Sequence, residues 1–292
     1  MTQTNKFDLD TLNREYSPSS CVDDINVYIR QYIELSRDAK AQANAQGRLH
    51  NGLQYGEAET QRLDLYLPST SPQSKLMVYI HGGYWQELSK EESSFAAPTF
   101  QQQGFHYAVI GYTLAPDASL SDIVEENRRA IAWLYTEASR FGYDPEQIYV
   151  CGSSAGAHLS MMMLQTKWSD YLVDYQGNII KGVCAVSGIY DLQPLLSTYV
   201  NEALKMDSVE AQANSPLLLP LPKAVPIIIA FGANETSEFK RQSQVMAQKL
   251  RAHGFAVRYQ QIDGRNHFDV IVELCHESSW LSQQAISLMA ST

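Results

Sequence analysis

Short apolar runs alternate with helical patterns along most of this chain, and no other feature of the sequence restricts its fold as strongly. The apolar runs have the length of strands and lie at residues 75–80, 106–112, 148–151, 183–186, 225–231 and 256–262. Helical periodicity separates several of them, most clearly at residues 121–141 and 242–253. Strands that are apolar along their whole length are buried on both faces. The pattern therefore predicts an α/β fold in which helices cover both faces of a mainly parallel central sheet.

The segments before this series predict a helix and two more strands. Residues 20–23 resemble a capping box, and apolar side chains recur every three to four residues behind it. This periodicity predicts an amphipathic helix over residues 20–46. Strand candidates follow at 52–55 and 62–67, and Pro68 closes the second of them.

The segment at residues 192–222 contains four prolines and little periodicity. It predicts a small cap over the site rather than a second domain, and a last helix is expected from residue 278 onward. Residues 1–292 are therefore expected to form a single domain. In parallel sheets of this kind, binding and catalytic sites form beyond the carboxyl ends of the strands.

The composition excludes several classes of function. The net charge of −10 and the pI near 5.2 argue against nucleic acid and an anionic membrane as partners. The longest apolar runs are too short to span a bilayer, and no signal peptide is evident. No metal site is expected, because the chain has no H-E-x-x-H motif and its seven histidines are scattered. Four cysteines without a C-x-x-C spacing predict reduced thiols in the cytoplasm.

The stretch from Gly152 to Gly156 fits the pattern G-x-S-x-G directly after a predicted strand and before a helical run. A serine at the centre of this pattern sits on a sharp turn that holds its hydroxyl above the sheet. The register makes Ser154 the nucleophile and leaves Ser153 at the unconstrained position. Cys151 is expected to point into the core, and His158 is expected to be a packed helix residue.

A Gly-Gly pair follows the predicted strand at residues 75–80, within the run His81-Gly82-Gly83. Glycines let backbone N–H groups approach the oxyanion that forms during acyl transfer. The H-G-G sequence at this place resembles the oxyanion loop of esterases and lipases.

A serine nucleophile needs a base, and His267 follows the last predicted strand, where the chain order serine, acid, histidine places one. The acid is less constrained by the residues. Glu235 follows the strand at 225–231 and is the first candidate, while Asp191 is an alternative that could instead cap the next helical turn. Glu238 is explained by the dipole of a helix N-terminus.

Four aromatic residues lie at or near the ends of predicted strands: Tyr84, Trp85, Tyr112 and Tyr190. If they ring the mouth of the site, they would hold a flat aromatic leaving group by stacking. Bulky side chains beside the oxyanion glycines would also leave room only for a short acyl group.

These motifs together resemble the serine-hydrolase type of kynurenine formamidase (arylformamidase), a family with the α/β-hydrolase fold. The likeness covers nearly the whole chain and is carried by several segments, which are Glu15-Tyr16-Ser17-Pro18-Ser19, His81-Gly82-Gly83-Tyr84-Trp85, residues 152–159, residues 188–195, Asn214-Ser215-Pro216, residues 238–243 and His267-Phe268-Asp269. Relatives carry aspartate where this chain has Glu235, so the longer glutamate requires an adjusted loop.

The resemblance implies hydrolysis of an N-formyl aryl amide such as N-formylkynurenine through an acyl-enzyme, without a cofactor. It implies Ser154, Glu235 and His267 as the catalytic triad. Gly82, Gly83 and the N–H of Ala155 would form the oxyanion hole. The same triad would also serve a general short-chain carboxylesterase or an acyltransferase. The expected partner is a small-molecule aryl amide or ester, with a homodimer left open.

Overall fold

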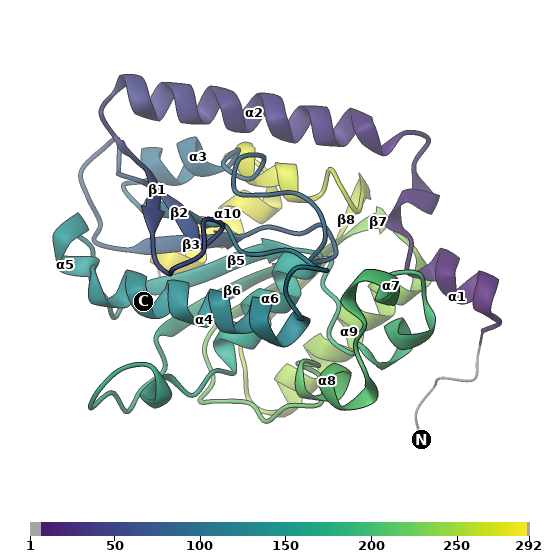
Figure 1. The fold of residues 1–292 in the computed structure, drawn as a ribbon. Helices are drawn as coiled ribbons and strands as arrows, with labels where there is room; N and C mark the ends of the chain where they lie inside the picture. Colours follow the sequence, from purple (N-terminus) through teal and green to yellow (C-terminus); the bar gives the residue numbers. More distant parts are fainter. Residues whose placement is uncertain (1–6, 291–292) are drawn as a thin grey trace.

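The computed structural model describes residues 7–290, which form an eight-stranded sheet with helices on both faces (Figure 1). The strand order is β1-β2-β4-β3-β5-β6-β7-β8. Strands β1 and β2 pair antiparallel, β2 also pairs antiparallel with β4, and the remaining pairs are parallel. The bounds are β1 Leu49–Gln54, β2 Arg62–Tyr66, β3 Leu76–Ile80, β4 His106–Ile110, β5 Ile148–Ser153, β6 Ile180–Val186, β7 Ile227–Asn234 and β8 Val257–Asn266.

The two faces of the sheet are covered by different helices, and the strands alternate between them. In β3, Val78 packs in one hydrophobic cluster while Met77 and Tyr79 pack in the other, as the two-residue period of a strand requires. One face carries α2 (Ile25–Ala45), α3 (Ala97–Gln102) and α10 (Trp280–Ala290), and the other carries α4 (Leu120–Thr136), α6 (Ala155–Leu164) and α9 (Ser237–Ala252) (Figure 1). The predicted α/β fold with a mainly parallel sheet is confirmed.

The predicted strands are confirmed to within a few residues, but two helix predictions need correction. Helix α2 begins at Ile25 with Asp24 as its N-cap, so the capping box expected at Ser20 does not exist. Ser20 lies instead in a short 3-10 turn, η1 (Pro18–Cys21), because an extended residue at Val22 separates this turn from the helix. The helix expected over 121–141 ends at Thr136 and is followed by a separate short helix, α5 (Ala138–Phe141).

Several short helices were not predicted. They are α1 (Leu9–Glu15), α3 (Ala97–Gln102), η2 (Trp168–Asp170), η3 (Gln193–Ser197), α7 (Asn201–Leu204), α8 (Ser208–Ala213) and η4 (Ile271–Cys275). Three of them, η3, α7 and α8, lie within residues 192–222. This segment contacts the loop after β3 through a hydrogen bond of 2.9 Å, which the side-chain amide of Gln86 donates to the carbonyl of Val200.

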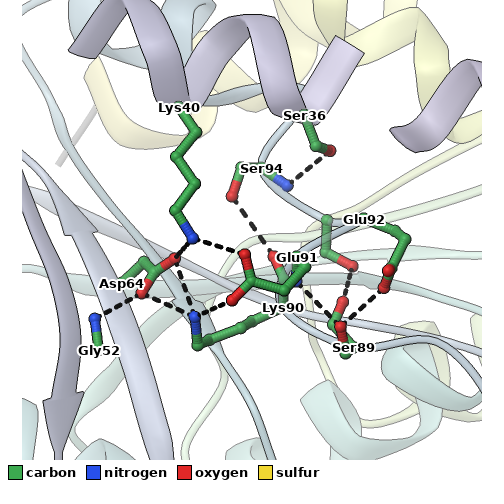
Figure 2. A network of polar contacts seen from close by, with 10 residues as sticks. Ser36, Lys40, Gly52, Asp64, Ser89, Lys90, Glu91, Glu92 and Ser94 are labelled. Atoms are coloured by element: carbon green, nitrogen blue, oxygen red, sulfur yellow. Dashed lines mark hydrogen bonds and ion pairs between the residues drawn. The ribbon is translucent and has the colours of Figure 1, made fainter. Parts of the chain in front are cut away.

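A buried ion-pair network ties α2 and the loop after β3 to the antiparallel edge of the sheet (Figure 2). Asp64 on β2 is fully buried, and its carboxylate lies 3.0 Å from the Nζ atoms of both Lys40 and Lys90. The same carboxylate accepts the backbone N–H of Gly52 at 2.7 Å. Removing one partner from a buried charge is costly, so this network fixes the position of the loop and of the helix above it.

Candidate active site

Ser154 lies on the tight turn between β5 and α6. Its backbone adopts φ +58° and ψ −120°, and its N–H donates a hydrogen bond to the carbonyl of Val186 at 2.9 Å. A positive φ is strained for a residue with a side chain, and such strain is typical of catalytic turns. Ala155 begins α6, so its N–H has no acceptor within the helix and is free for another group.

The glycines on each side of Ser154 are required by close backbone contacts. A Cβ atom on Gly152 would lie 2.4 Å from the carbonyl carbon of Gly156 and 2.7 Å from the carbonyl oxygen of Ile80. A Cβ atom on Gly156 would lie only 2.0 Å from the same Ile80 oxygen. The turn therefore fits directly against the end of β3, which explains the glycines of the motif.

The loop after β3 lies against this turn. A Cβ atom on Gly82 would lie 2.8 Å from the carbonyl oxygen of Ser153 and 3.4 Å from the Cβ of Ser154. Gly83 has φ +92°, and its carbonyl accepts the N–H of Gln86 and that of Glu87, each at 2.9 Å. Gly82 of the predicted oxyanion loop therefore lies directly beside the predicted nucleophile, and both glycines line the same cavity as Ser154.

Glu235 and His267 form a buried pair. The Nδ1 of His267 lies 3.1 Å from the Oε2 of Glu235. The other carboxylate oxygen, Oε1, accepts the hydroxyl of Ser187 at 2.6 Å and the N–H of Gly232 at 2.5 Å. A carboxylate held in this way fixes the imidazole and leaves its Nε2 for the nucleophile. His267 and Ser154 line the same cavity.

The other carboxylates that the sequence offered are engaged elsewhere. Asp191 accepts the N–H of Gln193 at 3.1 Å, which is the local capping role considered as its alternative. Glu238 forms an ion pair with Arg241 at 2.8 Å and accepts the hydroxyl of Tyr16 at 2.9 Å. Of the candidate acids, Glu235 is the one hydrogen-bonded to the histidine.

The cavity in front of Ser154 has a volume of about 320 Å³ and is largely apolar. Its aromatic lining residues are Tyr32, Tyr79, Tyr84, Phe95, Tyr199 and Phe268, and its aliphatic ones are Pro18, Ile25, Ile29, Leu88, Val200 and Ile271. The walls come from the N-terminal segment, the loop after β3, the segment at 192–222 and the loop after β8. A cavity of this size and composition accommodates a small aromatic molecule.

Of the four aromatics predicted to bind substrate, only Tyr84 lines this cavity, and the prediction for the other three is corrected. Trp85 is fully buried and packs edge-on against His158 with ring centroids 5.0 Å apart. Tyr112 stacks on His81 at 4.1 Å and donates its hydroxyl to the carbonyl of that residue. Tyr190 is also fully buried. These large rings lie in the core, where burial of their whole surface stabilises the fold.

Several cavity residues were missed by the sequence reasoning. Tyr32, Ile25 and Ile29 belong to the apolar face of α2, which reads as an ordinary core-facing stripe. Their periodicity was visible in the sequence, but nothing local shows that this face looks onto a cavity. Phe268 directly follows the predicted base, and this position was a signal that could have been used.

Cys151 and His158 are scaffold residues, as expected. Cys151 is fully buried on β5 beside Cys184 of β6. His158 is buried on α6, and its Nε2 lies 2.7 Å from the carbonyl oxygen of Asn214. Burial lowers the pKa of His158 to about 4, and it lowers the pKa of His81 to about 4 as well.

The buried histidines predict an acid-sensitive fold. Because the folded pKa of His158 lies near 4 and the ordinary value is 6.5, the unfolded chain binds more protons between these values. The free energy of unfolding should therefore fall as the pH is lowered from 6.5 towards 4. On going from pH 7 to pH 5, we expect the free energy of unfolding to fall by about 2 kcal/mol less in His158→Gln than in the unmodified protein. Urea titrations at the two pH values measure this, and equal pH dependence in both proteins would contradict it.

Among residues 7–290, no group of three or more His, Cys, Asp or Glu side chains is arranged to hold a metal ion. Within the same range, no helix combines the length and the apolar character needed to cross a membrane.

The chain is similar to a known protein family, to two kynurenine formamidases and to a solved structure. Residues 63–250 match the BD-FAE family. Kynurenine formamidases from Danio rerio and Salmo salar are each 36% identical to the chain, and in both cases the match covers 100% of each sequence. Among solved structures, a Silicibacter sp. protein assigned provisionally as a thioesterase superposes with a TM-score of 0.82. It is 27% identical in sequence, and the match covers 96% of this chain and 98% of the other.

Proposed function

Because this chain belongs to the BD-FAE family and, by full-length similarity, to the kynurenine formamidase family of α/β-hydrolases, we propose that it hydrolyses N-formyl aryl amides such as N-formylkynurenine. The observation that carries the proposal is the convergence of Ser154, the Glu235–His267 pair and the Gly82–Gly83 loop at one aromatic cavity. The kynurenine formamidases named above support the formyl amide as the scissile group.

The proposed reaction uses each of these groups in turn. The Nε2 of His267 takes the proton of the Ser154 hydroxyl, and the oxygen attacks the formyl carbon. The negative charge that forms on the carbonyl oxygen is stabilised by the N–H groups of Gly82, Gly83 and Ala155. His267 then gives the proton to the departing aryl amine, and water hydrolyses the formyl-enzyme by the same route. Glu235 orients the imidazole and stabilises its charged form.

The chemistry of the leaving group fits this arrangement. The nitrogen lone pair of an aryl amine is delocalised into the ring, so an aryl amine departs more readily than an alkyl amine. The aromatic walls of the cavity support binding of such a ring by stacking, at about 1 kcal/mol for each ring pair. A serine triad can then cleave the amide without the extended substrate binding that a protease needs.

A general short-chain carboxylesterase is the second candidate. The Silicibacter protein, which shares 27% identity and nearly the full length, is itself placed provisionally among thioesterases. Ester, thioester and activated amide substrates all pass through the same acyl-enzyme, so the leaving group distinguishes the two functions.

A hydrolysis panel tests the proposal. We expect kcat/KM to fall steadily from formyl or acetyl through butyryl to octanoyl in p-nitrophenyl esters, and N-formyl anilides to exceed N-acetyl anilides. The reason is the limited cavity, in which a longer acyl chain competes with the aromatic leaving group for space. A preference for octanoyl esters without formanilide cleavage would reject the formamidase and leave a lipase-like esterase. Products other than the free acid after addition of alcohols would indicate an acyltransferase.

We also propose that residues 192–222 act as a cap within a single domain, since Tyr199 and Val200 of this segment line the cavity. A cytoplasmic location is proposed because all four cysteines are free thiols in the structure. Neither nucleic acid nor a membrane is expected as a partner of a chain with net charge −10.

A further inference from the structure

None of the described residues that line the active-site cavity is a lysine or an arginine. Besides the tyrosines and the base His267, Glu87 is the one ionisable residue among the described residues that line the cavity. A carboxylate on a substrate is normally recognised by the guanidinium of an arginine or by a lysine ammonium. This cavity offers neither.

Two lysines near the cavity walls are engaged in ion pairs outside the cavity. Lys90 lies three residues after Glu87 in the same loop, but its Nζ is 3.0 Å from the buried carboxylate of Asp64 and also contacts Glu91 (Figure 2). Lys40 of α2 is bound to the same two acids, at 3.0 Å and 2.5 Å. Turning either lysine toward the cavity would weaken the compensation of a fully buried charge, which is costly.

The cations beside the predicted acid and base are occupied in the same way. Arg265 lies two residues before His267 and forms ion pairs with Glu273 and, at 3.5 Å, with Asp269. Arg241, on the first turns of α9 after Glu235, is held at 2.8 Å by Glu238. Arg30 of α2 directly follows Ile29 of the cavity wall, but it is exposed, pairs with Asp24 at 3.9 Å and does not line the cavity. The other four cations named above are held by acids, so none of them is left to bind a substrate carboxylate.

Glu87 differs from these paired cations in both its charge and its lack of a partner. Its N–H bonds to the carbonyl of Gly83, so it lies one turn from the oxyanion glycines, and the residue is exposed to solvent. Among residues 7–290, its carboxylate has no hydrogen bond or ion pair. The aromatic rings that line the cavity include Tyr32, Phe95 and Phe268. One face of each is covered by another ring, since Tyr32 stacks on Phe95 and Phe268 stacks on Tyr28, and an open ring face attracts cations through the ring quadrupole. An exposed, unpaired acidic residue and several aromatic rings in the same cavity wall together favour a positively charged group.

We propose that this site selects aryl amides whose leaving group carries an ammonium group, disfavours those that carry only a carboxylate, and uses Glu87 as a specificity-determining residue. The inference rests on the proposed function, because it describes the leaving group of the same reaction. The overall charge of −10 acts in the same direction during approach of the substrate.

Four matched substrates test the proposal. Each is an ortho-formamidophenyl ketone, and the ketone side chain ends in a methyl group, an ammonium, a carboxylate, or both charged groups. We expect kcat/KM with the ammonium substrate to be about 3- to 5-fold above that with the methyl substrate, and the carboxylate substrate to fall below it, as for a solvent-exposed charge pair. The ammonium-to-methyl ratio should drop about threefold in Glu87→Gln and should also shrink at high salt.

Glu202→Gln is the matched control, because it removes the same charge from an exposed residue of α7 that does not line the cavity. This variant should leave all four substrate ratios unchanged. A carboxylate substrate that is cleaved faster than the methyl one, or a ratio that does not change in Glu87→Gln, would overturn the inference. If no formanilide is cleaved, the formamidase proposal fails, and the same four side chains on aryl acetates then decide the charge selection separately.

Discussion

Replacement of Ser154 by alanine should reduce kcat on the order of 10⁶-fold while leaving the fold intact. Loss of the nucleophile from a serine triad has an effect of this size, and what remains comes from the oxyanion hole and binding. The hydroxyl contributes little to packing, because Ser154 is held by its backbone N–H and by the flanking glycines. Single-turnover and steady-state rates on an N-formyl anilide measure the loss, and an organophosphate label should no longer attach.

Ser153→Ala provides the control. Ser153 ends β5 and is similarly buried, but the register places it at the unconstrained position of the motif. This variant should keep most of its activity and its labelling. Label attached to Ser153 or to Cys151 in the unmodified protein would show that the nucleophile has been assigned to the wrong residue.

Replacement of Glu235 by glutamine should reduce kcat on the order of 10⁴-fold, as expected when the imidazole is held in the wrong tautomer. The reason lies in the donors around the carboxylate, since Oε1 accepts from both Ser187 and Gly232. If a glutamine keeps its oxygen on these two donors, its amide N–H group faces Nδ1 of His267. The proton of the imidazole then moves to Nε2, which can no longer accept the serine proton.

Asp191→Asn is the matched carboxyl-to-amide control, because an asparagine oxygen can still accept the N–H of Gln193. We expect this variant to change kcat by no more than about twofold, consistent with a local capping role. Thermal unfolding of both variants separates loss of catalysis from loss of fold. If Asp191→Asn were the more damaging of the two, the acid would have to be reassigned to the earlier strand.

The sequence alone determined those features whose physical cause is local, namely the strands of the sheet and the positions of the nucleophile and the base. Apolar runs of strand length can be buried only between two layers of helices, which predicted the α/β fold. The tight turn at Ser154 demands small neighbours, and Gly152 and Gly156 record that demand in the sequence. His267 follows from its place after the last strand. The helix start at Ile25 was misplaced, because Ser20 and Asp24 both have side chains suited to capping.

Only the tertiary structure decided which distant side chains meet. It paired Glu235 rather than Asp191 with the histidine. It also placed Trp85 and Tyr190 in the core, while Tyr32 of α2 lines the cavity. It also bound the neighbouring cations to buried or adjacent acids, which leaves the cavity without a positive side chain. These outcomes depend on contacts between segments far apart in the chain, and periodicity and motif spacing report only the local conformation of each segment.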